Sequence, residues 1–302
     1  MIVYAVPNGG IHGGIKVAYQ TVDALCALGV SACIATPDGL ASQWFRSNAP
    51  VLSRAEALAQ MSEDDLLVFS LPHDYSELRA TGHQLVFHCQ GTDPLIDPVI
   101  RDERVEVLTC WQQAAEYVEQ RAGRESTDVG IQIADDFYHR GEEKDALAVA
   151  FMPRRGKEIA LHIAGANPAL RAQPIDGLSE TQVAMRLRRS SAFIASSVGE
   201  GFGLPALEAM AAGCVVLSVP VVGGEEFLSD GENCFYGDTE TLCRAASLLI
   251  DPAAAPRLAK IRYAAIATAL SYRPALSRQK LARWVGSLSL AARQPFVERL
   301  SG

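Results

Sequence analysis

The stretch from Ser196 to Gly213 constrains the fold more than any other part of the sequence. It reads SSVGEGFGLPALEAMAAG and follows a short apolar run, AFIAS, that predicts a buried strand. Three closely spaced glycines then predict a loop, and Pro205 with the strong helix formers after it predicts a helix ending at Gly213. A strand, a glycine loop and a helix present unpaired backbone N–H groups to whatever lies beyond the strand. The sequence therefore predicts a phosphate-binding turn.

Two carboxylates, Glu200 and Glu208, lie on this turn with seven residues between them. The pattern EGFGLPALEAMAAG resembles the signature of the retaining glycosyltransferases of family 4, the group 1 transferases of GT-B fold. An ordinary Rossmann-like turn needs only the glycines, whereas this match extends through the whole helix. The resemblance implies that Glu200 faces the donor sugar and Glu208 binds the ribose of the nucleotide. It also implies that four loop residues contact the donor diphosphate: Gly201, Phe202, Gly203 and Leu204.

The resemblance implies an α/β fold of the GT-B type, with two Rossmann-like domains facing each other across a cleft. We expect an N-terminal, acceptor-side domain over residues 1–142 and a C-terminal domain over 143–274 that binds the nucleotide sugar. Residues 275–302 are then a C-terminal helix that crosses back to pack on the N-terminal domain. The chain is short for the family, and we expect elements to be trimmed mainly from the first domain.

The N-terminal residues predict a βαβ unit with a glycine-rich first turn. A strand over residues 2–6 is followed by the loop PNGGIHGG, a helix over 15–28 and a strand over 30–36. The glycine spacing differs from the dinucleotide fingerprint G-x-G-x-x-G, so we do not expect a dinucleotide here. The resemblance places Gly13 and Gly14 in a Gly-Gly loop near the donor phosphates and the acceptor.

Two histidines are candidates for contact with the donor. His12 lies in the Gly-Gly loop, and His88 ends a strand predicted over residues 84–88. Ligands of open α/β sheets bind at the carboxyl ends of strands, and many members of the family place a His at a comparable strand end, close to the donor sugar. The alternatives are a solvated loop histidine at position 12 and a strand-capping histidine at position 88, so the choice between the two stays open.

A cluster of cations follows the first strand of the second half. A strand predicted over residues 146–152 leads into PRRGK, in which Arg supplies a forked donor and Lys a point charge for a diphosphate. The resemblance assigns the catalytic cations to Arg155 and Lys157, with Arg154 as the competing choice. The loop is shorter than is usual in the family, and a plain surface pair of arginines is the alternative.

Composition limits the other classes of function. The seven cysteines are scattered without a C-x-x-C pair, which is typical of reduced thiols in a cytoplasmic protein. No signal peptide is recognisable, and no stretch has the ~20 apolar residues of a membrane helix. From Pro252 onward nine Lys or Arg and one Glu give +8, so the other 251 residues carry −16 of the net charge of −8. The acidic remainder disfavours nucleic acid, while the basic C-terminal helices favour a peripheral contact with the inner face of a membrane.

The function implied by the resemblance is transfer of a sugar, with retention of configuration, from a nucleoside-diphosphate donor to a hydroxyl acceptor. The acceptor is a carbohydrate or a lipid-linked carbohydrate, in surface polysaccharide or glycolipid synthesis. We expect no metal and no cofactor, because cations and oriented N–H groups stabilise the departing diphosphate. The rival hypotheses are a catalytically silent GT-B protein that acts as a partner or scaffold, and a GT-B nucleotide-sugar epimerase.

Overall fold

A computed structural model describes residues 1–288 of the chain as parts of two compact units. The first unit combines Met1–Gln132 with Ala275–Gly302, and the second is Ile133–Pro274. The first boundary therefore lies at Gln132 rather than at the expected residue 142. Among residues 1–288, no helix has both the length and the apolar character needed to cross a membrane.

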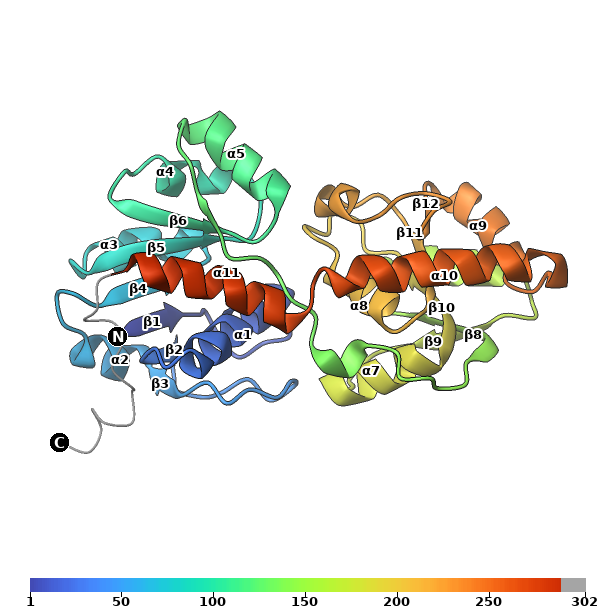
Figure 1. The fold of residues 1–302 in the computed structure, drawn as a ribbon, viewed down its shortest axis with the longest axis horizontal. Helices are drawn as coiled ribbons and strands as arrows, with labels where there is room; N and C mark the ends of the chain where they lie inside the picture. Colours follow the sequence, from blue (N-terminus) through green and yellow to red (C-terminus); the bar gives the residue numbers. More distant parts are fainter. Residues whose placement is uncertain (289–302) are drawn as a thin grey trace. The chain divides into compact units, whose positions relative to one another are not determined.

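The first unit is built on a seven-stranded sheet in the order β3-β2-β1-β4-β5-β6-β7, and all of its strand pairs are parallel (Figure 1). Its strands are β1 (Ile2–Ala5), β2 (Ala32–Thr36), β3 (Val51–Ser53), β4 (Leu66–Phe69), β5 (Gln84–Cys89), β6 (Val105–Thr109) and β7 (Thr127–Asp128). Its helices are α1 (Gly13–Ala27), α2 (Arg54–Gln60), α3 (Tyr75–Arg79), α4 (Asp97–Ile100), α5 (Gln112–Ala122) and α11 (Pro274–Ser287). The direction of winding reverses between β1 and β4, as in a doubly wound sheet.

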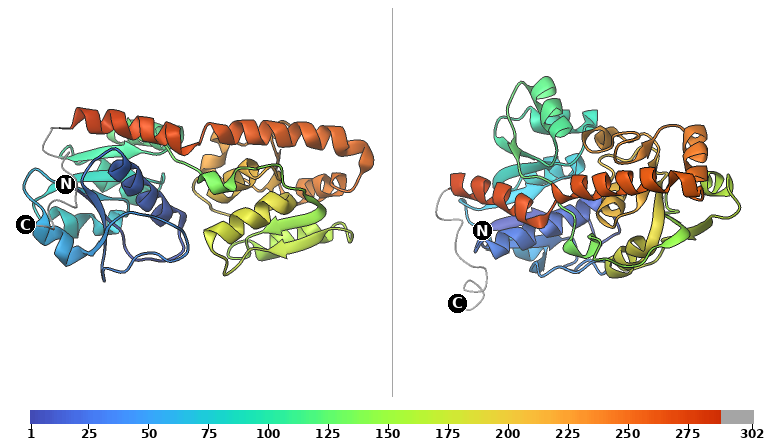
Figure 2. Two further views of the ribbon diagram at one scale, coloured as in Figure 1. Left: turned by 60° about the horizontal axis from the view of Figure 1, so that its bottom comes forward. Right: turned by 45° about the vertical axis from the view of Figure 1, so that its right-hand side comes forward.

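Helix α11 shares the hydrophobic core of the first unit with α1 (Figure 2). Leu281 and Trp284 are almost fully buried against apolar side chains of α1 and the sheet. The indole Nε1 of Trp284 donates a hydrogen bond to Glu106 Oε1 at 2.7 Å, so the polar edge of this buried ring is satisfied. The last described helix therefore completes the unit that the N-terminal residues begin.

The second unit contains a five-stranded parallel sheet in the order β12-β11-β10-β8-β9. Its strands are β8 (Asp145–Phe151), β9 (Arg171–Pro174), β10 (Ser190–Ala195), β11 (Val215–Ser218) and β12 (Phe235–Tyr236). Its helices are α6 (Lys157–Gly165), α7 (Glu180–Arg189), α8 (Leu204–Ala211), α9 (Thr239–Leu248) and α10 (Ala255–Leu270). The smaller sheet belongs to this unit because only one strand, β9, lies beyond β8. The expectation that elements are trimmed mainly from the first domain, relative to the family, stays a prediction.

The winding of the second sheet reverses between β8 and β10. From β8 the chain passes through α6 to the edge strand β9, and α7 then carries it back to β10 on the other side of β8. Because the chain leaves β8 on one side and β10 on the other, the loops that follow these two neighbouring strands diverge and leave space between them. In open α/β sheets this switch point is where ligands bind.

The positive charge of the C-terminal segment is partly engaged within the protein. Arg273 pairs with Asp135 at 2.8 Å, and Lys280 pairs with Asp128 at 2.5 Å. The remainder of the tail expected to contact a membrane, residues 289–302, lies outside the described residues. Contact with a membrane therefore stays a prediction.

Candidate active site

The loops that follow β8 and β10 meet at the switch point of the second sheet. The two strands are paired in parallel, with Phe151 opposite Ile194 near their carboxyl ends. Each strand then leads into a loop with a sequence-predicted feature, the cation loop (residues 152–156) after β8 and the glycine loop (residues 196–203) after β10. The register of the sheet therefore brings the two motifs to the same edge.

Gly156 is the contact between these loops. It precedes α6 with a φ of +77°, a conformation that side chains other than glycine rarely adopt. A Cβ atom at this position would also overlap the carbonyl oxygen of Ser196, the first residue of the glycine loop. Backbone meets backbone here, and only glycine fits.

The cation loop presents exposed positive charge at this edge. Arg155 lies in the turn, and Lys157 is the first residue of α6. Neither side chain forms an ion pair or a side-chain hydrogen bond with any other residue among positions 1–288. Arg154 is exposed in the same turn, so the choice between the two arginines as diphosphate ligand stays open.

The glycine loop is held by the segment after β11. Gly203, with a φ of +93°, caps α8, and a Cβ there would meet Val221 Cγ2 at 3.4 Å. The amide of Gly223 donates to the carbonyl of Gly201 at 2.5 Å, and the amide of Val222 donates to the backbone carbonyl of Glu200 at 3.3 Å. In the first turn of α8, Pro205 has no N–H group and the amide of Ala206 donates to the Gly203 carbonyl at 3.0 Å, so the Leu204 amide and the positive end of the helix dipole are what this end offers to an anion.

The two signature carboxylates differ in exposure. Glu200 is half-buried in the glycine loop, whereas Glu208 lies in the middle of α8 with only 6% of its surface exposed. Phe202, expected to contact the donor, is 5% exposed, and its ring packs on Phe227 and Tyr272 with centroid separations of 5.2 and 5.9 Å. The Phe202 ring thus anchors the loop by packing into the second unit, and contact with a ligand falls to the other residues of the loop.

The predicted residues of the first unit lie at the carboxyl edge of its own sheet. Gly13 and Gly14 begin α1, and His12, exposed to solvent, is the residue before the helix. A Cβ on Gly14 would lie 2.5 Å from Oε1 of Gln90, the residue that follows β5. Because the Gln90 oxygen is the far end of a flexible side chain, a Cβ at position 14 would require only that side chain to move.

His88 is closed off from solvent. Its side chain is fully buried, with Nδ1 2.9 Å from the Tyr4 hydroxyl and Nε2 2.8 Å from the Cys110 sulfur. A neutral imidazole can donate at one nitrogen and accept at the other, so both contacts fit the uncharged form. Burial lowers the pKa of His88 from 6.5 to about 4. The structure thus gives His88 two internal partners, and its ring is not placed to touch a ligand at the surface.

Two further residues at the second unit's edge escaped the sequence analysis. Tyr272 follows α10 and reaches the aromatic cluster beneath the glycine loop, and Ser196 has a buried hydroxyl without a hydrogen-bond partner among the described residues. Ser196 belongs to the predicted strand end, but nothing in the sequence indicates that its hydroxyl is unpaired. Tyr272 lies 59 residues after Gly213, the last residue of the signature, and no local pattern connects the two.

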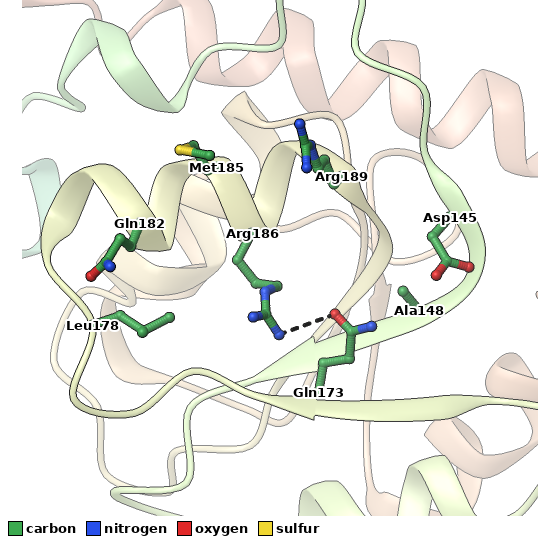
Figure 3. A pocket seen from close by; sticks show the side chains of 8 residues that line it. All are labelled: Asp145, Ala148, Gln173, Leu178, Gln182, Met185, Arg186 and Arg189. Carbon is green, nitrogen blue, oxygen red and sulfur yellow. Dashed lines mark hydrogen bonds between the residues drawn. The ribbon is translucent and has the colours of Figure 1, made fainter.

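The second unit also contains a cavity of about 500 Å³ away from these motifs (Figure 3). It lies between α7 and the strands β8 and β9, where Arg186 donates a 3.4 Å hydrogen bond to the Gln173 side chain. Its lining extends to Asp145 at the start of β8 and includes none of the predicted site residues. The position of this cavity alongside the sheet distinguishes it from the carboxyl edge at the switch point.

Comparisons with known proteins agree with this reading of the fold. Residues 138–251 match the family described as "Glycosyl transferases group 1". The structure is similar to that of Anabaena HepE in complex with UDP and glucose, with a TM-score of 0.73 and 14% identity over 95% of this chain and 99% of that one. It is also similar to sucrose-phosphate synthase from Thermosynechococcus elongatus, with a TM-score of 0.71 and 14% identity over 95% and 99% of the two chains. A glycosyltransferase from Rickettsia africae gives a TM-score of 0.70 and 12% identity over 95% and 98%. A search of curated protein sequences finds no match.

These matches confirm the GT-B fold for the chain and the resemblance to the group 1 transferases for most of its second unit. The matched residues include both the cation loop and the glycine loop. Residues 138–251 are therefore similar to the group 1 glycosyltransferases, and the chain as a whole has the GT-B fold.

The contact at Gly156 predicts a loss of nucleotide binding when a methyl group is added. In Gly156→Ala the Cβ forces the cation loop away from Ser196, so we expect affinity for a nucleoside diphosphate to fall at least about tenfold by calorimetry. The matched control is Gly141→Ala, before β8 and outside both loops, which has a φ of +91° but no neighbour within 4 Å of its Cβ. Equal losses in the two variants would show that backbone strain, and not the contact between the loops, is responsible.

The buried neutral His88 predicts an acid-sensitive first unit. Because its pKa is about 4 when folded and 6.5 when exposed, the unfolded chain takes up a proton first as the pH falls. The stabilisation is complete above pH 6.5 and is lost towards pH 4, at a cost of up to about 3 kcal/mol in the free energy of unfolding.

Urea unfolding followed by tryptophan fluorescence measures this, because the three tryptophans, Trp44, Trp111 and Trp284, all belong to the first unit. His88→Gln is expected to flatten the dependence on pH, whereas the exposed His73→Gln serves as the control and keeps it. An unchanged slope in His88→Gln would contradict the assignment.

Proposed function

We propose that this protein is a retaining glycosyltransferase of family 4, transferring a sugar from a nucleoside-diphosphate donor to a hydroxyl acceptor. The observation that carries the proposal is the meeting of the cation loop and the glycine loop at the switch point of the second sheet. One edge then offers the cations Arg155 and Lys157, a helix N-terminus and two carboxylates, which are the groups that a diphosphate linked to a sugar and a ribose needs.

The diphosphate is assigned to Arg155, Lys157 and the amides of residues 201–204. Breaking the bond between the sugar and the diphosphate develops negative charge on the departing phosphate, and preorganised cations and N–H groups stabilise that charge. The absence of a protein partner for Arg155 and Lys157 within residues 1–288 supports this role. The orphan hydroxyl of Ser196 supports it too, since a buried polar group without a partner favours a ligand that supplies one.

The carboxylates are assigned to the hydroxyl groups of the donor. Glu200, in the loop, accepts hydrogen bonds from the sugar, and Glu208, on α8, accepts them from the ribose. A retaining glycosidase uses two carboxylates about 5 Å apart as nucleophile and acid/base. We give the present pair a binding role.

The remaining features of the reaction follow from the resemblance. The acceptor is a carbohydrate or a lipid-linked carbohydrate of a surface polysaccharide or glycolipid, reached at the inner face of a membrane. The reaction needs neither metal nor cofactor, since the cations of the chain neutralise the diphosphate. Because Anabaena HepE is described in complex with UDP and with UDP-glucose, UDP comes first among the nucleotides to test.

Thermal unfolding in the presence of UDP, GDP, ADP, dTDP and CMP tests this proposal. A nucleotide present at 100 times its Kd adds about 2.7 kcal/mol to the free energy of unfolding of the unit that binds it. We expect one diphosphate to stabilise the protein strongly, with or without excess EDTA. In Arg155→Gln and Lys157→Gln the affinity is expected to fall by about tenfold or more each, because each loses a charge-assisted hydrogen bond.

Lys260→Gln is the matched control, since Lys260 is an exposed cation on α10 without a hydrogen-bond or ion-pair partner in the described part of the chain. Incubation of the favoured nucleotide sugar with simple glycoside acceptors then identifies the reaction. A retained anomeric configuration in the product supports the proposal. A donor that is only isomerised indicates the epimerase, and a protein that binds no nucleotide indicates the silent scaffold.

A further inference from the structure

An aromatic cluster lies beneath the glycine loop. Phe202 and Phe227 are 5% and 4% exposed, and Tyr272 stands against both, with ring centroids 5.9 and 6.2 Å away. The rings are tilted or edge-to-face, arrangements in which aromatic pairs attract one another. Because Phe202 belongs to the glycine loop, the position of that loop depends on the Tyr272 ring.

The hydroxyl of Tyr272 provides a second connection to the same loop. This hydroxyl donates a hydrogen bond to Glu226 Oε1 at 3.3 Å. Burial, more than the nearby Glu226, raises the pKa of Tyr272 above its ordinary value, so the hydroxyl keeps the proton that it donates. Glu226 ends the short helical segment Val222–Glu226, whose Gly223 amide donates to the carbonyl of Gly201. Tyr272 thus contacts both the glycine loop and the segment that holds it.

Tyr272 also holds the place where the chain passes between the two units. The chain crosses after Gln132 and again after Pro274, and the amide of Ile133 donates to the carbonyl of Tyr272 at 2.9 Å. Next to it, Arg273 pairs with Asp135. In the first unit, Ser277 donates to the carbonyl of Val129 at 3.1 Å. The two crossing segments are therefore hydrogen-bonded to each other within each unit.

From these contacts we infer that Tyr272 is a positioning residue that couples the glycine loop to the paired crossing segments. The ring and hydroxyl of Tyr272 hold the glycine loop, and its backbone carbonyl accepts the hydrogen bond of the Ile133 amide. A ligand that reduces the motion of the glycine loop therefore also reduces the motion of the Ile133 segment. A donor that fixes the glycine loop then also stiffens the point at which the chain passes between the units. The use of a donor rests on the proposed function, whereas the coupling itself is a property of the chain.

Hydrogen exchange and calorimetry test the coupling, with UDP as the probe. In the unmodified protein we expect UDP to slow exchange of the Ile133 amide. In Tyr272→Leu the aromatic contacts are lost, so we expect UDP to bind about tenfold more weakly and no longer to slow that amide. Tyr272→Phe keeps the ring and is expected to retain the slowing. A purely structural role would reduce the amount of folded protein without changing Kd in the molecules that remain.

Tyr263→Leu is the matched control, because Tyr263 lies on α10 with 75% of its surface exposed. If Tyr272→Leu fails to fold, Phe227→Leu replaces it, since Phe227 touches both other rings. Unchanged affinity and slowing in the leucine variant would overturn the inference, and so would a phenylalanine variant that behaves like leucine.

Failure of the proposed function gives a different result. If UDP and the other nucleotides do not bind the unmodified protein, the donor assignment fails. The coupling between the glycine loop and the crossing segments is then tested by hydrogen exchange in the protein without a nucleotide. In that case Tyr272→Leu must still speed exchange at both the Gly223 and Ile133 amides relative to Tyr263→Leu. Acceleration at neither amide, or at only one of them, overturns the coupling.

Discussion

The close approach of Gly156 to Ser196 is the constraint on which the candidate active site depends. Parallel pairing brings β8 and β10 to the same edge, but two loops leaving that edge stay together only if their backbones can meet. The absence of a side chain at Gly156, together with its positive φ, permits that contact. The cation loop, the start of α6 and the glycine loop then form one surface. Both the positive charge and the N–H groups of the proposed diphosphate site follow from this packing.

The second unit is also arranged to keep the glycine loop in place when no ligand is bound. Hydrogen bonds from the segment after β11 hold the loop on one side, and the Phe202 ring anchors it from below. Preorganisation of this kind lowers the cost of ordering a binding loop and orients donors before charge develops. The exposed cations Arg155 and Lys157 are not preorganised in this way, because no described side chain holds them. A bound diphosphate would fix their positions.

The sequence was sufficient for the architecture because the signature combines local and long-range information. A strand, a glycine loop and a helix in that order identify the turn, and the similarity to group 1 transferases extends it to a GT-B fold, which the structural matches confirm. Features that depend on contacts distant in sequence could not be predicted. Examples are the buried partners of His88, the contact of Tyr272 with Phe202, and the placement of the smaller sheet in the second unit. Hydrophobic periodicity identifies strands but does not say how many strands each sheet contains.

A structure of the protein with UDP bound tests the central claim most directly. The account predicts the diphosphate at the switch point between β8 and β10, with its oxygens within hydrogen-bond distance of the amides of residues 201–204 and of at least one side chain among Arg154, Arg155 and Lys157. It also predicts the ribose beside Glu208. A nucleotide seated in the cavity between α7 and the strands β8 and β9, or one whose diphosphate touches neither loop, would contradict it.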